Sequence, residues 1–129
     1  MIIAYSKKKE GNDKLSENFK VRELACKDGS DTIFIDSALV RLVQEIRDYF
    51  GKPVIINSGY RTESYNKKIG GATYSQHLYG KAADIRIAGV SPKEIAKFVE
   101  TRIPNTGGIG IYPSFVHVDV RSTKSRWNG

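Results

Sequence analysis

The stretch Phe115-Val116-His117-Val118-Asp119-Val120-Arg121 alternates apolar and polar side chains with a period of two, which is typical of a β-strand. Its valines would face one way and its three polar residues the other. The stretch Ala82-Ala83-Asp84-Ile85-Arg86-Ile87 predicts a second strand, with its two charged residues opposite its two isoleucines. If these strands pair side by side, their polar faces meet and Asp84 comes close to His117.

Two helices flank these strands in the sequence. Apolar residues between Asp36 and Gly51 recur at spacings of three and four, which predicts a helix with one face on the core. Asp36 or Ser37 can cap its start, and Gly51 can end it. The sequence Ser91-Pro92-Lys93-Glu94 is a capping box with proline at the first helical position. It opens a second helix, which we expect to end before Pro104.

Shorter elements complete the expected fold. Residues 53–58 are rich in β-branched side chains and predict a strand, and residues 62–69 predict a short helix. Helices mixed with short strands and glycine turns favour one compact α+β domain, with a mainly antiparallel sheet flanked by helices. Residues 1–18 are polar after the first five and predict a loosely held N-terminal arm. The domain itself would then occupy residues 19–129.

Length and charge limit the classes of function. A chain of 129 residues has room for one domain. The net charge of +7 would attract a polyanion such as nucleic acid, an acidic membrane surface or a bacterial wall polymer. A nucleic-acid-binding domain is the weaker alternative, because the Lys and Arg residues are scattered and no recognition helix or stacking aromatic signature accompanies them.

The sequence also predicts where the chain is made. No apolar run approaches the roughly 18 residues of a membrane span, so we expect no membrane insertion. The chain opens with a short apolar stretch followed by Lys7-Lys8-Lys9, which is the reverse of a secretory signal. We therefore expect synthesis in the cytoplasm without a signal peptide of its own.

The single cysteine, Cys26, excludes an internal disulfide. No Cys-His context surrounds it in the sequence, so a catalytic nucleophile is not indicated. We expect Cys26 to be a small buried apolar residue.

Both histidines of the chain have neighbours that could share a metal. Alone, either histidine fits a structural or solvated role, and the alternating strand fits a solvated sheet face. Together, His77, His117 and Asp84 supply the three protein ligands of a catalytic zinc site, which leaves a fourth position for water. Ligands of one zinc lie only roughly 3–3.5 Å apart, so the segment from His77 to Asp84 must double back, and Gly80 permits that turn.

A wider set of motifs accompanies these residues. They are Ser58-Gly59-Tyr60-Arg61-Thr62, Asn66, Gly70-Gly71-Ala72, Ser75-Gln76-His77 followed by Gly80, Ala82 and Asp84-Ile85, then His117-Val118-Asp119 and Arg126-Trp127. This pattern resembles the D-alanyl-D-alanine carboxypeptidase family of zinc peptidases, which includes phage endolysins and has a fold similar to the hedgehog signalling domain. The resemblance runs from about Phe19 to Trp127.

The resemblance implies roles for particular residues. It places Zn²⁺ on His77, Asp84 and His117. It implies that Arg61 holds the substrate or its transition state and that Ser75 contacts the substrate, and we expect Tyr60 to help position the peptide. The substrate would be the stem peptide of bacterial peptidoglycan, cut as a carboxypeptidase or as an endopeptidase. The place of action would be the bacterial wall, with phage lysis as one route of release.

One position departs from the pattern of the family. Many relatives carry a catalytic acid or base three residues before the last zinc histidine, and Ser114 occupies that position here. Asp119 is the nearest carboxylate on the predicted face of His117, so we take it as the candidate base. Its alternative role is to orient a zinc ligand. A binding module that holds metal without turnover also stays open, as do the bond cut and the oligomeric state.

Overall fold

Five strands form the central sheet, in the order β5-β6-β8-β7-β9. The computed structural model describes all residues, 1–129. The strands are β5 Ile55–Ser58, β6 Ala82–Arg86, β7 Gly108–Ile111, β8 Val116–Asp119 and β9 Ser125–Asn128. All neighbouring strands pair antiparallel except β7 and β9, which are parallel. The expected α+β domain with a mainly antiparallel sheet is confirmed.

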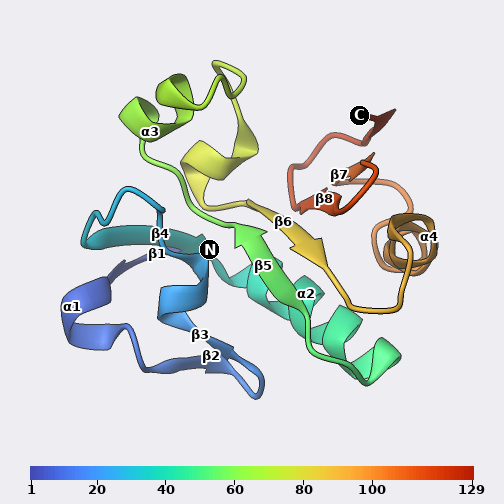
Figure 1. Cartoon of the computed structure of the whole chain (residues 1–129), viewed down its shortest axis with the longest axis horizontal. Coiled ribbons are helices and arrows are strands. Elements are labelled where there is room, and N and C mark those ends of the chain that lie inside the picture. Colours follow the sequence, from blue (N-terminus) through green and yellow to red (C-terminus); the bar gives the residue numbers. More distant parts are fainter.

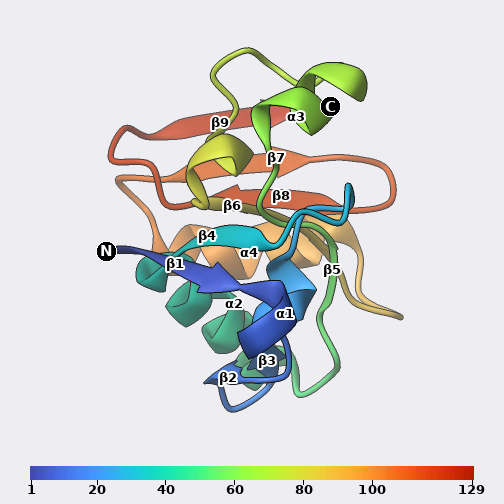
Figure 2. The ribbon, with the colours of Figure 1, turned by 90° about the vertical axis from the view of Figure 1, so that its left-hand side faces the viewer.

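Helices cover both faces of this sheet. Figures 1 and 2 show helices α2 (Ser37–Phe50) and α4 (Pro92–Arg102) on one side. Helix α3 (Glu63–Lys68) and the 3₁₀ helix η2 (Gln76–Tyr79) lie on the other side. The predicted ends of α2 are confirmed, because the Asp36 side chain accepts from the Ala38 amide and Gly51 is left-handed with φ of 63°.

The two faces of the sheet differ in chemistry. The face toward α2 and α4 contributes Ala83, Ile85, Ile109, Val116 and Val118 to the hydrophobic core. The opposite face, toward η2, carries the alternate residues of the same strands. The alternation in β8 therefore turns its valines into the core and its polar residues toward a separate polar layer, as the sequence predicts.

The N-terminal segment is part of the folded unit. Its elements are β1 Ile2–Ser6, α1 Lys7–Glu10, β2 Lys14–Ser16, β3 Phe19–Lys20, the 3₁₀ helix η1 Val21–Leu24 and β4 Thr32–Asp36. Strand β1 pairs antiparallel with β4 along its whole length, from Ile2 opposite Asp36 to Ser6 opposite Thr32. The expected loosely held arm over residues 1–18 is therefore wrong. Backbone pairing with β4 fixes β1, whose sequence IIAYS is the apolar start of this segment.

Cys26 is buried at 2% exposure, as the sequence predicts. Its sulfur accepts a hydrogen bond from the Thr62 amide at 3.4 Å. The thiol therefore has a packing role between the segment after η1 and the start of α3.

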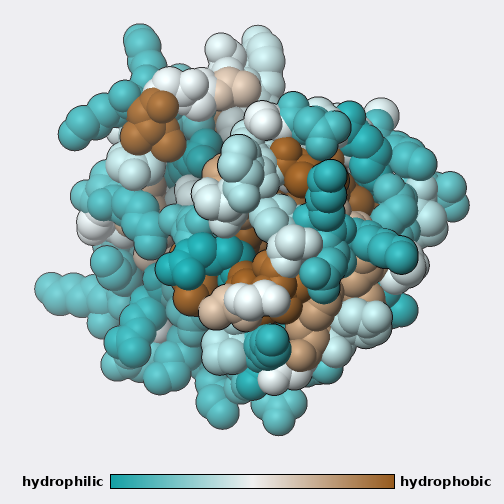
Figure 3. Space-filling model, turned by 45° about the vertical axis from the view of Figure 1, so that its right-hand side comes forward, coloured by the Kyte–Doolittle hydropathy of each residue, from teal (hydrophilic) through white to brown (hydrophobic).

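The molecular surface is mostly hydrophilic. On the face in Figure 3, hydrophobic residues form small patches separated by hydrophilic ones. No helix combines the length and apolar character that crossing a bilayer requires.

Candidate metal centre

Three elements bring His77, Asp84 and His117 together. Asp84 of β6 and His117 of β8 are direct partners in the sheet register. His77 comes from η2, which turns back at Gly80 with φ of 70°. A Cβ at Gly80 would lie 2.2 Å from the Phe34 carbonyl oxygen, so both the backbone angle and the space require glycine. All three side chains are buried, and one ligand atom from each lies within 4.8 Å of the others.

The distances suit a single metal ion. His77 Nε2 lies 3.3 Å from Asp84 Oδ1, and His117 Nδ1 lies 3.0 Å from the same oxygen. Ligands bound at about 2 Å to one tetrahedral zinc lie roughly 3–3.5 Å apart. The structure thus places each histidine at such a separation from Asp84, with all three ligand atoms within 4.8 Å of one another.

The protonation state of His77 strengthens this fit. Its Nδ1 lies 2.7 Å from the Gly59 carbonyl oxygen, which can only accept, so Nδ1 carries the proton and donates it. In the neutral ring, Nε2 then directs a lone pair at Asp84 Oδ1, which is also an acceptor. Two acceptors 3.3 Å apart need a cation between them, either a proton or a metal ion. Histidine ligands of metals are commonly oriented by such a second hydrogen bond.

Arg61 holds the other side of Asp84. Its guanidinium donates to Asp84 Oδ2 at 3.2 Å, to Asn66 Oδ1 at 3.2 Å and to Ser58 Oγ at 3.1 Å. Burial favours the neutral form of Asp84, but its contacts with His117 and His77 outweigh burial and hold the pKa of Asp84 well below its usual range. Asp84 is therefore an anion under ordinary conditions, as a metal ligand must be.

Asp119 lies behind His117 rather than in the cavity. The two residues meet through His117 Nε2 and Asp119 Oδ2 at 2.8 Å. Asp119 is fully buried, and its Oδ1 also accepts from the Gly108 amide at 2.9 Å and from the Arg121 amide at 3.1 Å. The Arg121 side chain donates to both oxygens, with Nε on Oδ1 at 2.9 Å and Nη2 on Oδ2 at 2.7 Å.

This environment weighs against the prediction that Asp119 is the catalytic base, which stays a prediction. Both of its oxygens are already occupied, and it does not line the cavity that exposes His77, Asp84 and His117. Burial disfavours its charge, yet the hydrogen bonds from His117 and Arg121 keep the pKa of Asp119 well below its usual range. The geometry fits the alternative role, in which Asp119 orients the His117 ring.

The remaining predicted residues divide between the cavity and the core. The cavity has a volume of about 420 Å³, and both Arg61 and Ser75 line it. Ser75 also caps η2, because its Oγ accepts from the His77 amide at 3.2 Å. Tyr60 does not line the cavity, and its predicted contact with substrate stays a prediction. Its ring packs edge-on against Phe34 with centroids 5.6 Å apart, since side chains next to each other in an extended segment point to opposite sides.

Among the cavity residues to which sequence reasoning assigned no role, three lie together. They are Tyr112, Arg121 and Trp127. Arg121 could have been found, since it follows His117 and Asp119 on the same face of the alternating strand. Trp127 reaches the site through the parallel pairing of β9 with β7, where it lies opposite Gly110. Ser114 is exposed in the turn before β8 and does not line the cavity.

The close approach of Gly108 to Asp119 gives a stability prediction. A Cβ at Gly108 would lie 2.1 Å from Asp119 Oδ2, which the surrounding hydrogen bonds hold in place. We expect Gly108→Ala to lower the free energy of unfolding by about 1–3 kcal/mol, the usual cost of overpacking. Chemical denaturation measures this change. Equal stability of Gly108→Ala and the parent protein would contradict the packing described.

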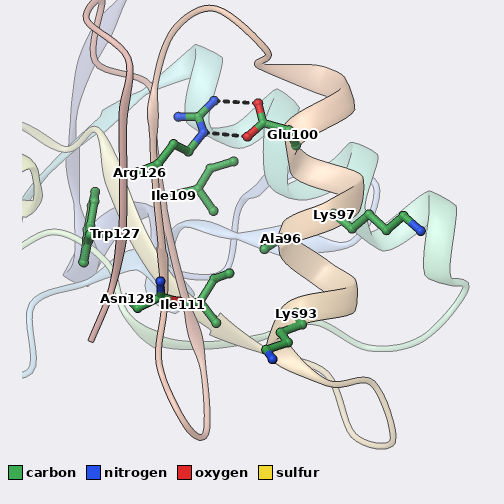
Figure 4. A pocket seen from close by; sticks show the side chains of 9 residues that line it. All are labelled: Lys93, Ala96, Lys97, Glu100, Ile109, Ile111, Arg126, Trp127 and Asn128. Carbon is green, nitrogen blue, oxygen red and sulfur yellow. Dashed lines mark hydrogen bonds and ion pairs between the residues drawn. The ribbon is translucent and has the colours of Figure 1, made fainter.

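A second cavity lies on the other side of strands β7 and β9. Its volume is about 410 Å³, and it runs between α4 and the sheet (Figure 4). Ile109, Ile111 and Ala96 form its apolar lining, and an ion pair between Arg126 and Glu100 closes one end. It contains no histidine or cysteine and only one carboxylate, which is already paired, so the metal centre lies in the first cavity.

Two imidazoles and one carboxylate at the floor of an open cavity define the class of mononuclear metal sites that retain a position for solvent. A sequence profile of the family described as Peptidase M15 matches residues 17–119. The chain belongs to the peptidase M15 family. The match begins after β1 and α1, so the first 16 residues lie outside the part shared with the family.

Individual relatives agree with this assignment. The chain is 38% identical over 78 residues to the probable peptidoglycan L,D-endopeptidase MepK of Haemophilus influenzae, covering 55% of this chain and 40% of that protein. It is 42% identical over 52 residues to the zinc D-Ala-D-Ala carboxypeptidase of Streptomyces albus G, covering 38% and 20%. It is 34% identical over 94 residues to the peptidoglycan L,D-endopeptidase MepK of Escherichia coli, covering 66% and 50%. The chain thus spans half or less of the length of each relative.

Proposed function

We propose that this protein is a zinc-dependent peptidase that hydrolyses an amide bond in the stem peptide of bacterial peptidoglycan. The observation that carries the proposal is the facing pair of acceptors, His77 Nε2 and Asp84 Oδ1 at 3.3 Å, with His117 Nδ1 at 3.0 Å from the same oxygen. Family membership and the names of the relatives support the choice of zinc and of peptidoglycan.

In this proposal, His77, Asp84 and His117 hold the zinc. The bound ion would polarise the scissile carbonyl and lower the pKa of its bound water to about 7. Gly59 and Asp119 fix the ring orientations of the two histidines through hydrogen bonds of 2.7 and 2.8 Å. Arg61 donates to Asp84 Oδ2 at 3.2 Å and lines the cavity beside the proposed ligands.

The place of action would be the bacterial wall. A phage lysis protein and a bacterial enzyme that remodels its own wall both need this chemistry, so the proposal covers both settings. The net charge of +7 supports attraction to anionic wall polymers.

Mass analysis of fragments released from purified peptidoglycan tests the proposal. The zinc-loaded protein should release new amino groups and fragments whose masses identify one cleaved amide. A chelator should stop the release and added zinc should restore it. The fragment masses also distinguish loss of a terminal residue, as by a carboxypeptidase, from cleavage of a cross-link or an internal bond.

One observation favours a second candidate, a wall-binding module without turnover. Asp84 is the only carboxylate that lines the cavity, and the sequence supplies Ser114 where many relatives carry an acid or base. Such a module would bind purified peptidoglycan in a metal-dependent manner but release no new amines in the same assay.

The proposed site predicts a pH dependence of zinc affinity. Burial lowers the pKa of the His117 ring, but its hydrogen bonds to Asp119 and Asp84 outweigh burial and raise that pKa above the ordinary 6.5. In the metal-free protein both ring nitrogens face carboxylate oxygens, which favours the protonated ring. Zinc must displace the Nδ1 proton, so affinity should fall as the pH drops, beginning above pH 6.5.

Competition with a chelator of known affinity measures this dependence between pH 5 and pH 8. Calorimetry in buffers of different ionisation enthalpy should detect about one proton released per zinc near neutral pH. A zinc affinity that stays constant down to pH 5 would contradict a histidine-containing site.

A further inference from the structure

Arg121 occupies the wall of the metal-centre cavity next to His117. Its Nε and Nη2 are committed to Asp119, at 2.9 and 2.7 Å. Its guanidinium carbon also lies 5.5 Å from the centroid of the Trp127 ring. The third guanidinium nitrogen, Nη1, makes no hydrogen bond within the protein, although the side chain is only 28% exposed. Arg121 therefore presents a fixed, unpaired donor at the cavity.

The aromatic residues beside Arg121 keep that donor in position. The indole ring of Trp127 packs against the backbone of Gly110, where a Cβ would lie 2.4 Å from the ring. The indole N–H donates to the Tyr112 hydroxyl at 2.9 Å, and Tyr112 stacks on Phe115 with ring centroids 4.4 Å apart and planes 8° from parallel. A guanidinium packed on such a platform loses little freedom when it binds a ligand.

The charges around the cavity favour an anionic ligand group. Arg61 is paired with Asp84, and Arg121 is paired with Asp119. With neutral histidines these four charges cancel, so a bound divalent cation would leave the cavity positive. No carboxylate other than Asp84 lines it to compensate. Arginine N–H groups suit a carboxylate partner.

The position of Arg121 indicates which carboxylate would fit. Asp119 Oδ2 contacts both His117 Nε2, at 2.8 Å, and Arg121 Nη2, at 2.7 Å. Arg121 Nη2 therefore lies within about 6 Å of His117 Nε2, and the ring separates Nε2 from the metal-facing Nδ1. The span from Arg121 to the metal is thus on the order of two to three extended residues at about 3.3–3.6 Å each. A carboxylate one residue beyond the scissile amide would reach Nη1.

We propose that Arg121 is a specificity-determining residue that recognises the free α-carboxylate at the C-terminus of the stem peptide. The inference rests on the proposed function, because it takes the zinc-bound centre as the reacting point. It favours substrates cut one residue from a free C-terminus over substrates in which that carboxylate is blocked.

Two synthetic stem peptides test this inference, one ending in D-Ala-D-Ala with a free carboxylate and the other carrying the C-terminal amide. The zinc-loaded parent protein should prefer the free acid by about tenfold or more, in kcat/KM and in calorimetric affinity, since a hydrogen bond to a charged group is at stake. Arg121→Lys and Arg121→Gln should reduce this preference to less than about threefold. Arg102→Gln, which removes an exposed arginine paired with Glu45, should leave it unchanged.

The ratio between the two peptides separates recognition from structural damage. Distortion of Asp119 and His117 by the Arg121 variants would lower both rates together and would reduce zinc content, which is measured in parallel. The inference would be overturned if the parent protein cleaved and bound the acid and the amide equally well, or bound neither peptide. It would also be overturned if both Arg121 variants kept the preference of the parent protein for the acid. If the acid binds more tightly through Arg121 but neither peptide is cleaved, the inference stands and the proposed reaction fails.

Discussion

Replacing His77 by alanine is expected to abolish tight zinc binding and all zinc-dependent release of fragments from peptidoglycan. The substitution leaves one imidazole and one carboxylate, below the three protein ligands of catalytic zinc sites. It also leaves the buried Gly59 carbonyl without its 2.7 Å hydrogen bond, which costs about 1–3 kcal/mol of stability. Metal analysis after dialysis and the fragment assay measure the two losses.

Tyr79→Phe is the matched control, since Tyr79 belongs to the same 3₁₀ helix but is 43% exposed and does not line the cavity. It should keep both the zinc and the activity. Thermal unfolding of each variant establishes that it is folded. A folded His77→Ala protein that retains one zinc per chain and cleaves peptidoglycan would remove His77 from the site.

Replacing Asp119 by asparagine is expected to lower zinc affinity by about 10–100-fold and to lower activity with it. The parent carboxylate accepts from His117 Nε2 at 2.8 Å, which leaves Nδ1 available for the metal. An asparagine whose amide nitrogen faces Nε2 would instead favour the proton on Nδ1, the ring nitrogen that faces Asp84. The variant therefore tests an orienting role rather than a proton-transfer role.

The two roles of Asp119 predict different results. A base that only accepts a proton could be removed with zinc affinity intact and turnover lost. An orienting residue should affect zinc affinity and turnover together, and excess zinc should restore part of the rate. Asp48→Asn on helix α2, far along the chain from the site, controls for the loss of a carboxylate. Unchanged zinc affinity in Asp119→Asn would contradict the geometry described here.

The sequence predicted the parts of the site that follow from local alternation and from turns. The pairing of β6 with β8 brings Asp84 opposite His117, as the polar faces of the two strands indicated. Gly80 provides the reversal that returns the chain from His77 to Asp84. The helix from Ser37 to Phe50 ends at Gly51, as its apolar spacing predicted.

Other features depend on packing that no local pattern encodes. Tyr60 and Arg61 are neighbours in sequence, yet the tyrosine packs against Phe34 and the arginine reaches Asp84. Asp119 shares a strand face with His117, but its burial by Arg121 and Gly108 decides that it supports a ring rather than facing the cavity. The pairing of β1 with β4 likewise joins segments that are distant in the sequence, from Ile2 opposite Asp36 to Ser6 opposite Thr32, so no local pattern shows it.

Anomalous X-ray scattering at the zinc absorption edge, from crystals grown with one equivalent of zinc, tests the central claim most directly. The account predicts one strong peak bonded by His77 Nε2, Asp84 and His117 Nδ1 at about 2.0–2.2 Å. The same peak should vanish in His77→Ala crystals. A peak at any other group of side chains, or no peak with these three residues in contact as they are now, would contradict it.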